Sequence, residues 1–239
     1  LVTLEGGRYC LLAPSGLAAV ALVDTAFLQQ GDEMLLPDNV YGPNQTLADG
    51  ELVGWGITHR FYDPMDPADL AAKITPATRL VWLEAAGSIT LEFPDLPALT
   101  AVIRDANANR GDSARPIISA LDNTWGAGIA FNGFELGADV VMQALTKYPS
   151  GGADVLMGSV VTRDPALHHM LVDTHMRFGI GVGANDAELV LRGLPTTALR
   201  YEAQDRSTRV LAQWMSERPE VACVLHPASA ASIQAELTR

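Results

Sequence analysis

Three groups of side chains that could do chemistry lie next to predicted regular elements. Lys147 is the single amine in the apolar stretch QALTKYPSGGADVLMGSVV, and we expect it to be buried between two strands. Asp122 ends the strand-like run PIISALD, and Thr124 would share its face if the strand continued. Ser15 and Gly16 precede an apolar helix, whose free N–H groups and dipole favour an anion. An amine, a carboxylate and an anion site are therefore expected where ligands bind in α/β sheets.

Each of these residues also has an ordinary structural explanation. A lysine after a strand is usually solvated, an aspartate there usually forms a turn, and Ser-Gly before a helix is usually a cap. Together, however, they match the needs of pyridoxal phosphate (PLP): an amine for a Schiff base, a carboxylate opposite the pyridine nitrogen, and an anion site for the phosphate. Tyr41, in the loop DNVYGPN, could stack on the ring or could be a surface turn residue. A buried Lys147 would favour the neutral amine that attacks an aldehyde.

The composition narrows the possible partners. The chain has 239 residues and is 48% hydrophobic, which is enough to bury a sizeable core. Its formal net charge of -12 argues against nucleic acid and against an anionic membrane surface. The two cysteines, Cys10 and Cys223, lie far apart and form no disulfide framework. With no signal peptide and no apolar run long enough for a bilayer, the sequence predicts a cytoplasmic protein.

Short β-rich runs alternate with amphipathic runs up to about residue 164. Strands are predicted at 32–38, 57–63, 78–85, 116–124, 138–145 and 154–162, and helices at 15–30, 67–74 and 96–111, with a return toward helix at 44–56. This alternation predicts an α/β fold with a mostly parallel sheet wrapped by helices.

The character of the chain changes after Asp164. Helices are predicted at 166–178, 186–194 and 196–217, followed by one late strand at 221–227. The tail, 228–239, is interpreted as the opening of a second α/β unit that is cut short. We therefore expect a large domain over 1–194, and over 195–239 a linking helix and the beginning of a truncated C-terminal small domain. The histidines of the first of these helices are not at metal-ligand spacing, so no metal site is predicted.

Five stretches resemble one enzyme family, in the same order, along almost the whole chain. They are CLLAPSGLAAVALVDTAFLQQGDEMLLPDNVYGPNQ, WLEAAGSITLEFPDLPAL, DNTWGAG, ALTKYPSGGADVLMGSVVTRDP and VLRGLPTTALR. The specific part is DNTW with TKY following it. On these motifs the chain resembles the trans-sulfuration (Cys/Met metabolism) PLP-dependent enzymes. The resemblance implies the aspartate-aminotransferase-like fold (PLP-dependent transferase fold type I) and a homo-oligomer, usually a homotetramer built as a dimer of dimers.

The resemblance also implies an activity on a small amino-acid substrate. The expected reaction is that of a C–S lyase in methionine biosynthesis, which removes a thiol from cystathionine by β-elimination and leaves homocysteine, pyruvate and ammonia. Lys147 would form the internal aldimine and later move protons. Asp122 would pair with the pyridinium nitrogen, Thr124 would lie near the ring, and Tyr41 would stack on it.

The phosphate site is implied in the same way, with departures from the family pattern. The amides of Gly16 and Leu17, behind the cap Ser15, would hold the phosphate, and Thr146 would lie near it. Family members usually carry a serine where this chain has Ala144, GHSD where it has GGAD, and ESP where it has Glu-Ala-Ala. Losing one hydroxyl bond to an anion costs roughly 1.5–3 kcal/mol if no water replaces it.

Two alternatives stay open at this point. The chain could be another trans-sulfuration enzyme, such as a γ-lyase or γ-synthase, or a non-catalytic cofactor-binding fragment. The family's partner-subunit phosphate contacts would precede Leu1, and its carboxylate-binding arginine would follow Arg239. We therefore expect residues 1–239 alone to be a poor catalyst.

Overall fold

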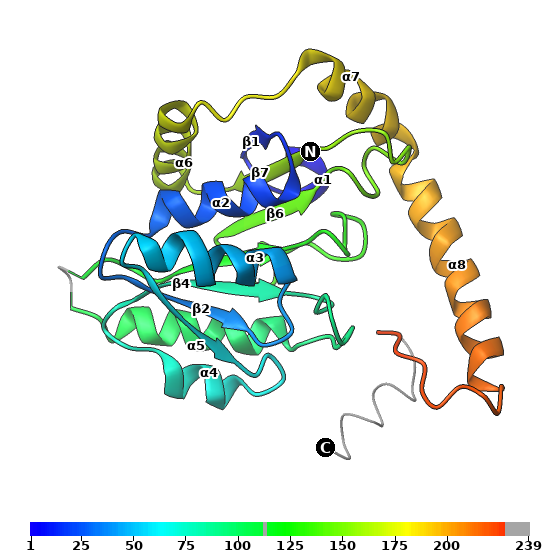
Figure 1. Cartoon of the computed structure of the whole chain (residues 1–239), viewed down its shortest axis with the longest axis horizontal. Coiled ribbons are helices and arrows are strands. Elements are labelled where there is room, and N and C mark those ends of the chain that lie inside the picture. The colour runs from blue at the N-terminus through cyan, green and yellow to red at the C-terminus, as the bar shows by residue number, and fades with distance from the viewer. Residues whose placement is uncertain (112–113, 228–239) are drawn as a thin grey trace.

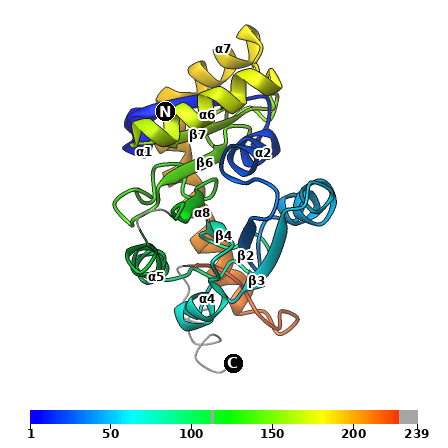
Figure 2. The same ribbon diagram turned by 90° about the vertical axis from the view of Figure 1, so that its left-hand side faces the viewer.

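The computed structural model describes residues 1–111 and 114–227, which form one seven-stranded sheet with helices on both faces (Figures 1 and 2). The strand order is β1-β7-β6-β5-β4-β2-β3. The strands are β1 (Tyr9–Ala13), β2 (Glu33–Pro37), β3 (Thr58–Tyr62), β4 (Thr78–Glu84), β5 (Ile118–Asp122), β6 (Val140–Ala144) and β7 (Gly158–Thr162). The helices are α1 (Val2–Glu5), α2 (Gly16–Phe27), α3 (Gly42–Leu47), η1 (Ala48–Leu52), α4 (Pro67–Lys73), α5 (Leu96–Ala108), α6 (Pro165–Phe178), α7 (Ala184–Gly193), η2 (Leu194–Thr196) and α8 (Thr197–Ser216).

The predicted mostly parallel sheet is confirmed. From β3 through β2, β4 and β5 to β6, each neighbouring pair of strands is parallel. Strand β7 then runs antiparallel to both β6 and β1. Strand β1 is not predicted from the sequence, and only the last residue of YCLLA is fully buried. It forms at the edge of the sheet by pairing with β7, from Tyr9 opposite Thr162 to Ala13 opposite Gly158.

Successive residues of each central strand face opposite layers of the core. In β2, Met34 and Leu36 pack into the cluster that includes α2 and α6, whereas Leu35 packs into the cluster that includes α4 and α5. Figure 2 shows α4 and α5 on one side of the sheet and α2 on the other. The sheet is therefore buried on both faces, which is why its strands read as apolar runs rather than as alternating patterns.

The predicted helices of the C-terminal part, α6, α7 and α8, are confirmed. Figure 1 shows α8 leaving the body of the molecule along one side. Among the described residues, no helix is both long enough and apolar enough to cross a membrane. The helical tendency predicted at 44–56 corresponds to α3 continued by η1, a five-residue π-helical turn.

The strand predicted at 221–227 is wrong. The described residues there have no regular structure, and none of the seven strands pairs with them. A run with strand-like composition needs a neighbouring strand to satisfy its backbone groups. The segment that follows it, 228–239, lies outside the described residues. The strands predicted at 116–124, 138–145 and 154–162 exist but are shorter at their ends, as β5, β6 and β7.

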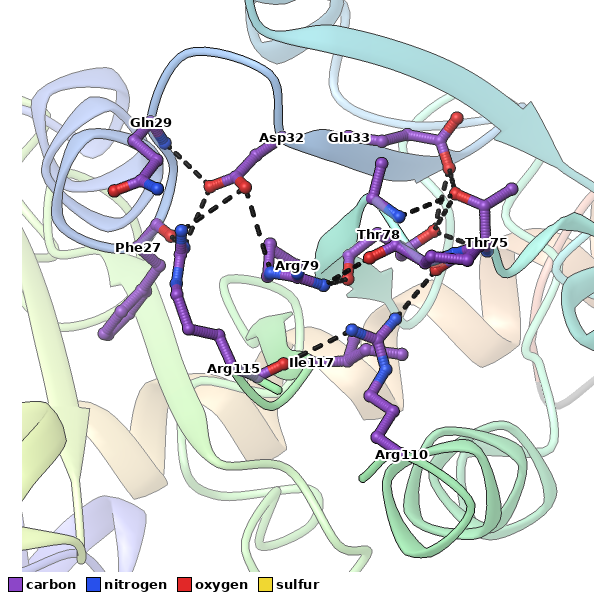
Figure 3. A network of polar contacts seen from close by, with 12 residues as sticks. Phe27, Gln29, Asp32, Glu33, Thr75, Thr78, Arg79, Arg110, Arg115 and Ile117 are labelled. Carbon is purple, nitrogen blue, oxygen red and sulfur yellow. Dashed lines mark hydrogen bonds and ion pairs between the residues drawn. The ribbon is translucent and has the colours of Figure 1, made fainter. Parts of the chain in front are cut away.

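The amino ends of β2 and β4 carry a network of paired charges (Figure 3). Asp32 accepts hydrogen bonds from Arg115 at 2.8 and 3.3 Å. Glu33 accepts from Arg60 at 2.8 and 2.9 Å and from Thr78 at 2.8 Å. Burial opposes ionisation of Glu33, but these hydrogen bonds outweigh it and hold the pKa of Glu33 below its ordinary value. The carboxylates at this edge of the sheet are thus satisfied within the protein.

Helix α2 is fastened to the sheet by a buried polar pair. The indole N–H of Trp82 in β4 donates to Asp24 Oδ1 at 2.8 Å, and both side chains are buried. The other carboxyl oxygen, Oδ2, has no hydrogen-bond partner. Burial raises the pKa of Asp24 to about 7, and the Trp82 hydrogen bond offsets only part of this shift.

This pair predicts how stability depends on pH. The pKa of about 7 lies above the value of about 3.9 for an unfolded aspartate, so the folded state binds more protons between these values. The stability from Asp24 is thus present at low pH and lost as pH rises through about 7. Asp24→Asn stays neutral and keeps an acceptor for Trp82. We expect the free energy of unfolding of this variant to gain about 2 kcal/mol over the wild type between pH 5 and pH 8.

The measurement is denaturant unfolding across that pH range, with Asp105→Asn on the exposed face of α5 as control. A difference between Asp24→Asn and the wild type that stays constant with pH would contradict the buried-charge account.

Candidate active site

A cavity of about 870 Å³ lies beyond the carboxyl ends of β4, β5 and β6 and beside the first turn of α2. Ligands of open α/β sheets bind at this edge. Every site residue predicted from the sequence lines the cavity: Ser15, Gly16, Leu17, Tyr41, Asp122, Thr124, Thr146 and Lys147. The structure therefore brings together all of the residues that the sequence singled out.

The first turn of α2 meets the end of β6 at very short range. Ser15 is the N-cap, as predicted, and its Oγ accepts from the Ala18 N–H at 3.0 Å. A Cβ on Gly16 would lie 2.8 Å from the Cβ of Ala144, so only glycine allows this approach. Helical geometry leaves the amides of Gly16 and Leu17 without an intrahelical acceptor. They are available to an anion in the cavity, and the helix dipole favours it.

Asp122 and Thr124 reach the same cavity by a turn. The prediction that the strand continues to Thr124 is wrong, because β5 ends at Asp122. The Thr124 N–H donates to Asp122 Oδ1 at 2.9 Å, a side-chain-to-backbone bond typical of a turn at a strand end. Thr124 Oγ1 in turn accepts from the Ala144 N–H at 2.9 Å. Thr124 thus links the ends of β5 and β6.

Two carboxyl groups stand side by side at this edge. Glu84 ends β4 opposite Asp122 at the end of β5 in the parallel register. Burial, and after it the neighbouring Asp122, raise the pKa of Glu84 to about 8, although hydrogen bonds from Ser88 and Tyr41 oppose the shift. Burial also raises the pKa of Asp122, while Thr124 and then Lys147 lower it. Among the residues that the structure describes, no arginine pairs with either carboxyl group as arginines do at the opposite edge, so this edge favours a positively charged ligand.

Tyr41 is held at the cavity by its backbone. It is the N-cap residue of α3, and its amide donates to Glu84 Oε2 at 2.8 Å. Ser88 Oγ donates to the other oxygen of Glu84. Glu84 thus joins the loop that carries Tyr41 to the loop that follows β4.

Lys147 lies in a turn after β6, and its side chain is exposed toward the cavity. The prediction that it is a buried amine is wrong: the flanking runs are buried strands, but the residue itself follows the end of one. The turn is closed by backbone hydrogen bonds from the Lys147 N–H to Ala144 O at 3.2 Å, from the Ser150 N–H to Leu145 O at 3.0 Å, and from the Gly151 N–H to Lys147 O at 3.0 Å. The hydrogen bonds of this turn, rather than burial of the side chain, therefore set where Lys147 lies.

Thr146, directly before the lysine, is tied to the strand that follows. Its Oγ1 accepts from the Met157 N–H at 3.1 Å and lies 3.3 Å from Met157 O. Its backbone N–H donates to the same carbonyl at 3.3 Å. These contacts hold the residue at the wall of the cavity, on the side of the turn that carries Lys147.

Several residues that shape the cavity are not among the site residues predicted from the sequence. Glu84 could have been found, because it ends a buried strand beside the one that ends at Asp122. Arg200 and Gln204 of α8, Trp125 and Ser88 also line the cavity. Trp125, Ser88 and Arg200 lie in stretches that resemble the family, but only the packing of α8 and of the loops shows that they reach this edge.

The donor set fits PLP. The cavity offers the amine of Lys147, the carboxylate of Asp122, free amides at the start of α2 and the aromatic ring of Tyr41. An amine, a carboxylate, an anion site and an aromatic ring are the groups that the aldehyde, the pyridine nitrogen, the phosphate and the ring face of PLP require. Ala144 contributes no hydroxyl, but its backbone N–H still orders Thr124.

Comparison with known proteins agrees with this fit. The chain is 37% identical over 225 residues to cystathionine beta-lyase MetC of Escherichia coli (strain K12), covering 94% of this chain and 55% of that relative. It is 39% identical over 225 residues to cystathionine beta-lyase of Bordetella avium, covering 94% of this chain and 54% of the relative. This chain thus spans about half the length of the curated relatives it matches.

The fold and the family follow from two further matches. The crystal structure of metB from Corynebacterium glutamicum superposes with a TM-score of 0.91 at 28% identity, over 99% of this chain and 59% of that one. This similarity confirms the fold that the resemblance implied. Residues 1–239 match the family of Cys/Met metabolism PLP-dependent enzymes. Because that match runs over the full chain, this chain belongs to the Cys/Met metabolism family of PLP-dependent enzymes.

Proposed function

We propose that this protein is a PLP-dependent C–S lyase that cleaves cystathionine by β-elimination to homocysteine, pyruvate and ammonia. The observation that carries the proposal is the single cavity in which Lys147, Asp122 and the first turn of α2 meet. The choice of reaction is supported by the two relatives named cystathionine beta-lyase, at 37% and 39% identity.

Each part of the cofactor has a partner among these residues. Lys147 Nζ would attach covalently to the aldehyde, with loss of one water. The Gly16 and Leu17 amides would hold the phosphate, with Thr146 beside it. When bound, PLP withdraws electrons from the α-carbon of the substrate. Tyr41 would cover the ring on its open face.

Lys147 is also suited to move the proton. Its side chain is exposed in the cavity, so it would be able to move once the substrate amino group took its place. Lys147 Nζ would accept the proton from the α-carbon and would return it to the thiol as the Cβ–S bond breaks. Water would then convert the remaining three-carbon fragment to pyruvate and ammonia.

Asp122 supplies the electrostatic part. A protonated pyridine nitrogen beside Asp122 would lower the pKa of its carboxyl, in the opposite direction to the shift caused by burial. The negative charge at the end of β5 would in return keep that nitrogen protonated. Thr124, bonded to Asp122 at 2.9 Å, holds the carboxylate in one orientation.

The first prediction concerns the covalent attachment. The sequence contains two lysines, Lys147 and Lys73, and Lys73 pairs with Asp69 in α4 at 2.7 Å. We expect borohydride reduction of protein mixed with PLP, followed by peptide mapping, to label Lys147 alone. Lys147→Ala should lose the visible absorbance of attached cofactor, whereas the matched control Lys73→Ala should keep it. A label on Lys73, or none, would refute the assignment.

The second prediction concerns Asp122. Asp122→Asn keeps the shape and removes the charge, so we expect PLP to bind but exchange of the substrate α-proton to slow by at least about a hundredfold, the scale of single electrostatic groups at reacting centres. Exchange is followed by NMR in D₂O, with Asp105→Asn as the control. An unchanged exchange rate in Asp122→Asn would dispose of this role.

The third prediction separates the members of the family. β-Elimination of cystathionine gives pyruvate and homocysteine, whereas γ-elimination gives 2-oxobutyrate and cysteine. We expect pyruvate, measured with the chain as printed and with the full natural reading frame that contains it. Lys147→Ala should reduce the rate by about 10²–10⁴-fold, the usual effect of removing a general base. Formation of 2-oxobutyrate, or of neither acid in both forms of the protein, would overturn the β-lyase proposal.

A further inference from the structure

Arg200, near the start of α8, donates hydrogen bonds to the turn that carries Lys147. Its Nη1 donates to Tyr148 O at 2.6 Å, and its Nη2 lies 3.3 Å from Pro149 O. The same Nη2 donates to Gly193 O at 3.0 Å, at the junction of α7 and η2. One guanidinium therefore binds the carbonyls of the two residues directly after Lys147 to the end of α7.

The guanidinium has little capacity left for a ligand. Nε donates to Thr196 Oγ1 at 3.1 Å, and Nη2 also reaches Thr197 Oγ1 at 3.3 Å. A guanidinium has five N–H donors in a fixed plane, and all three of its nitrogens are already engaged. Arg200 lines the cavity, but its geometry is that of a structural clamp and not that of a group waiting for a substrate carboxylate.

Two glycines show how closely Arg200 and the α7–α8 junction approach the turn that carries Lys147. A Cβ on Gly151 would lie 2.4 Å from the guanidinium carbon of Arg200, and the φ of Gly151, +70°, is one that residues with a side chain rarely adopt. A Cβ on Gly193 would lie 2.2 Å from Pro149 O and 2.4 Å from Ser150 O. The lysine turn and the α7–α8 junction are thus in direct backbone contact, with no side chain between them.

A second contact runs parallel to the clamp. The rings of Tyr148 and Tyr201 lie 4.9 Å apart between centroids, and the Tyr201 hydroxyl donates to Trp125 O at 3.1 Å. Trp125 follows Thr124 in the turn after β5. The start of α8 therefore touches both the turn with Lys147 and the turn with Thr124.

We propose that Arg200 is a positioning residue for Lys147: by holding the carbonyls of Tyr148 and Pro149 it fixes the turn from which the lysine reaches the cofactor. This rests on the proposed function, in which Lys147 attaches to PLP. The three nitrogens of the Arg200 guanidinium are engaged by protein oxygens, so Arg200 would act through the backbone of the turn.

The test compares the effect of one Arg200 substitution in two backgrounds, one with Lys147 and one with Lys147→Ala. Arg200→Lys keeps the charge but loses the planar fork that reaches several carbonyls at once. In protein with Lys147, we expect this change to slow covalent attachment of PLP, followed by visible absorbance, by roughly ten- to a hundredfold. In the Lys147→Ala background, where PLP binds only non-covalently, its affinity should stay within about twofold, since the phosphate site lies on α2. Arg192→Lys, on the exposed face of α7, is the matched control and should change neither value.

An equal loss in both backgrounds would mean that Arg200 shapes the whole cavity, and no loss in either would mean that the clamp is dispensable. Either result overturns the proposal. If the wild type itself does not attach PLP at Lys147, the proposed function fails instead.

Hydrogen exchange tests the clamp without any cofactor. Arg200→Lys should speed exchange at the Ser150 and Gly151 amides, which close the turn, by about tenfold or more, while the amides of β5 stay unchanged. Unchanged exchange at both turn amides would also overturn the proposal. Faster exchange throughout the sheet would show general destabilisation and would count against a local clamp.

Discussion

The contact between Gly16 and Ala144 is the constraint on which the cavity depends. Gly16 opens α2 and Ala144 closes β6, and a Cβ on Gly16 would lie only 2.8 Å from that of Ala144. The free amides at the start of α2 and the turn with Lys147 therefore both lie next to this contact. The Trp82–Asp24 hydrogen bond fastens the same helix nearer its other end, so its first turn has little freedom to move away from β6.

The carboxyl groups at the two ends of the strands lie in opposite electrostatic environments. At the amino ends of β2 and β4, Asp32 and Glu33 are paired with arginines, and hydrogen bonds lower the pKa of Glu33. At the carboxyl ends of β4 and β5, burial raises the pKa of both Glu84 and Asp122. An arrangement that is unfavourable for the protein alone, yet ordered by hydrogen bonds from Tyr41 and Thr124, is typical of a site that a ligand completes.

Much of the fold and of the site could be predicted from the sequence, for identifiable reasons. Buried strands such as β4 are long apolar runs, and Ser15 is a cap that only a helix start explains. The prediction failed where tertiary contacts decide whether a segment forms a strand. Strand β1 forms because it pairs with β7, whereas none of the seven strands pairs with 221–227. Lys147 was expected to share the burial of its neighbours, but a turn can expose one residue between two buried runs. Arg200 was missed because its partners lie about fifty residues away along the chain.

The backbone contacts of Ala144 and of the lysine turn bear on the departures from the family pattern. From the sequence alone, Ala144 and the GGAD stretch could be signs of an eroded cofactor loop. In the structure, Ala144 packs against Gly16 and orders Thr124 through its amide. Gly151, which GGAD shares with the family's GHSD, adopts a positive φ directly against the Arg200 guanidinium. The departures at Ala144, Gly152 and Ala153 therefore leave the backbone contacts of the turn and of the helix start in place and change only side chains beside them.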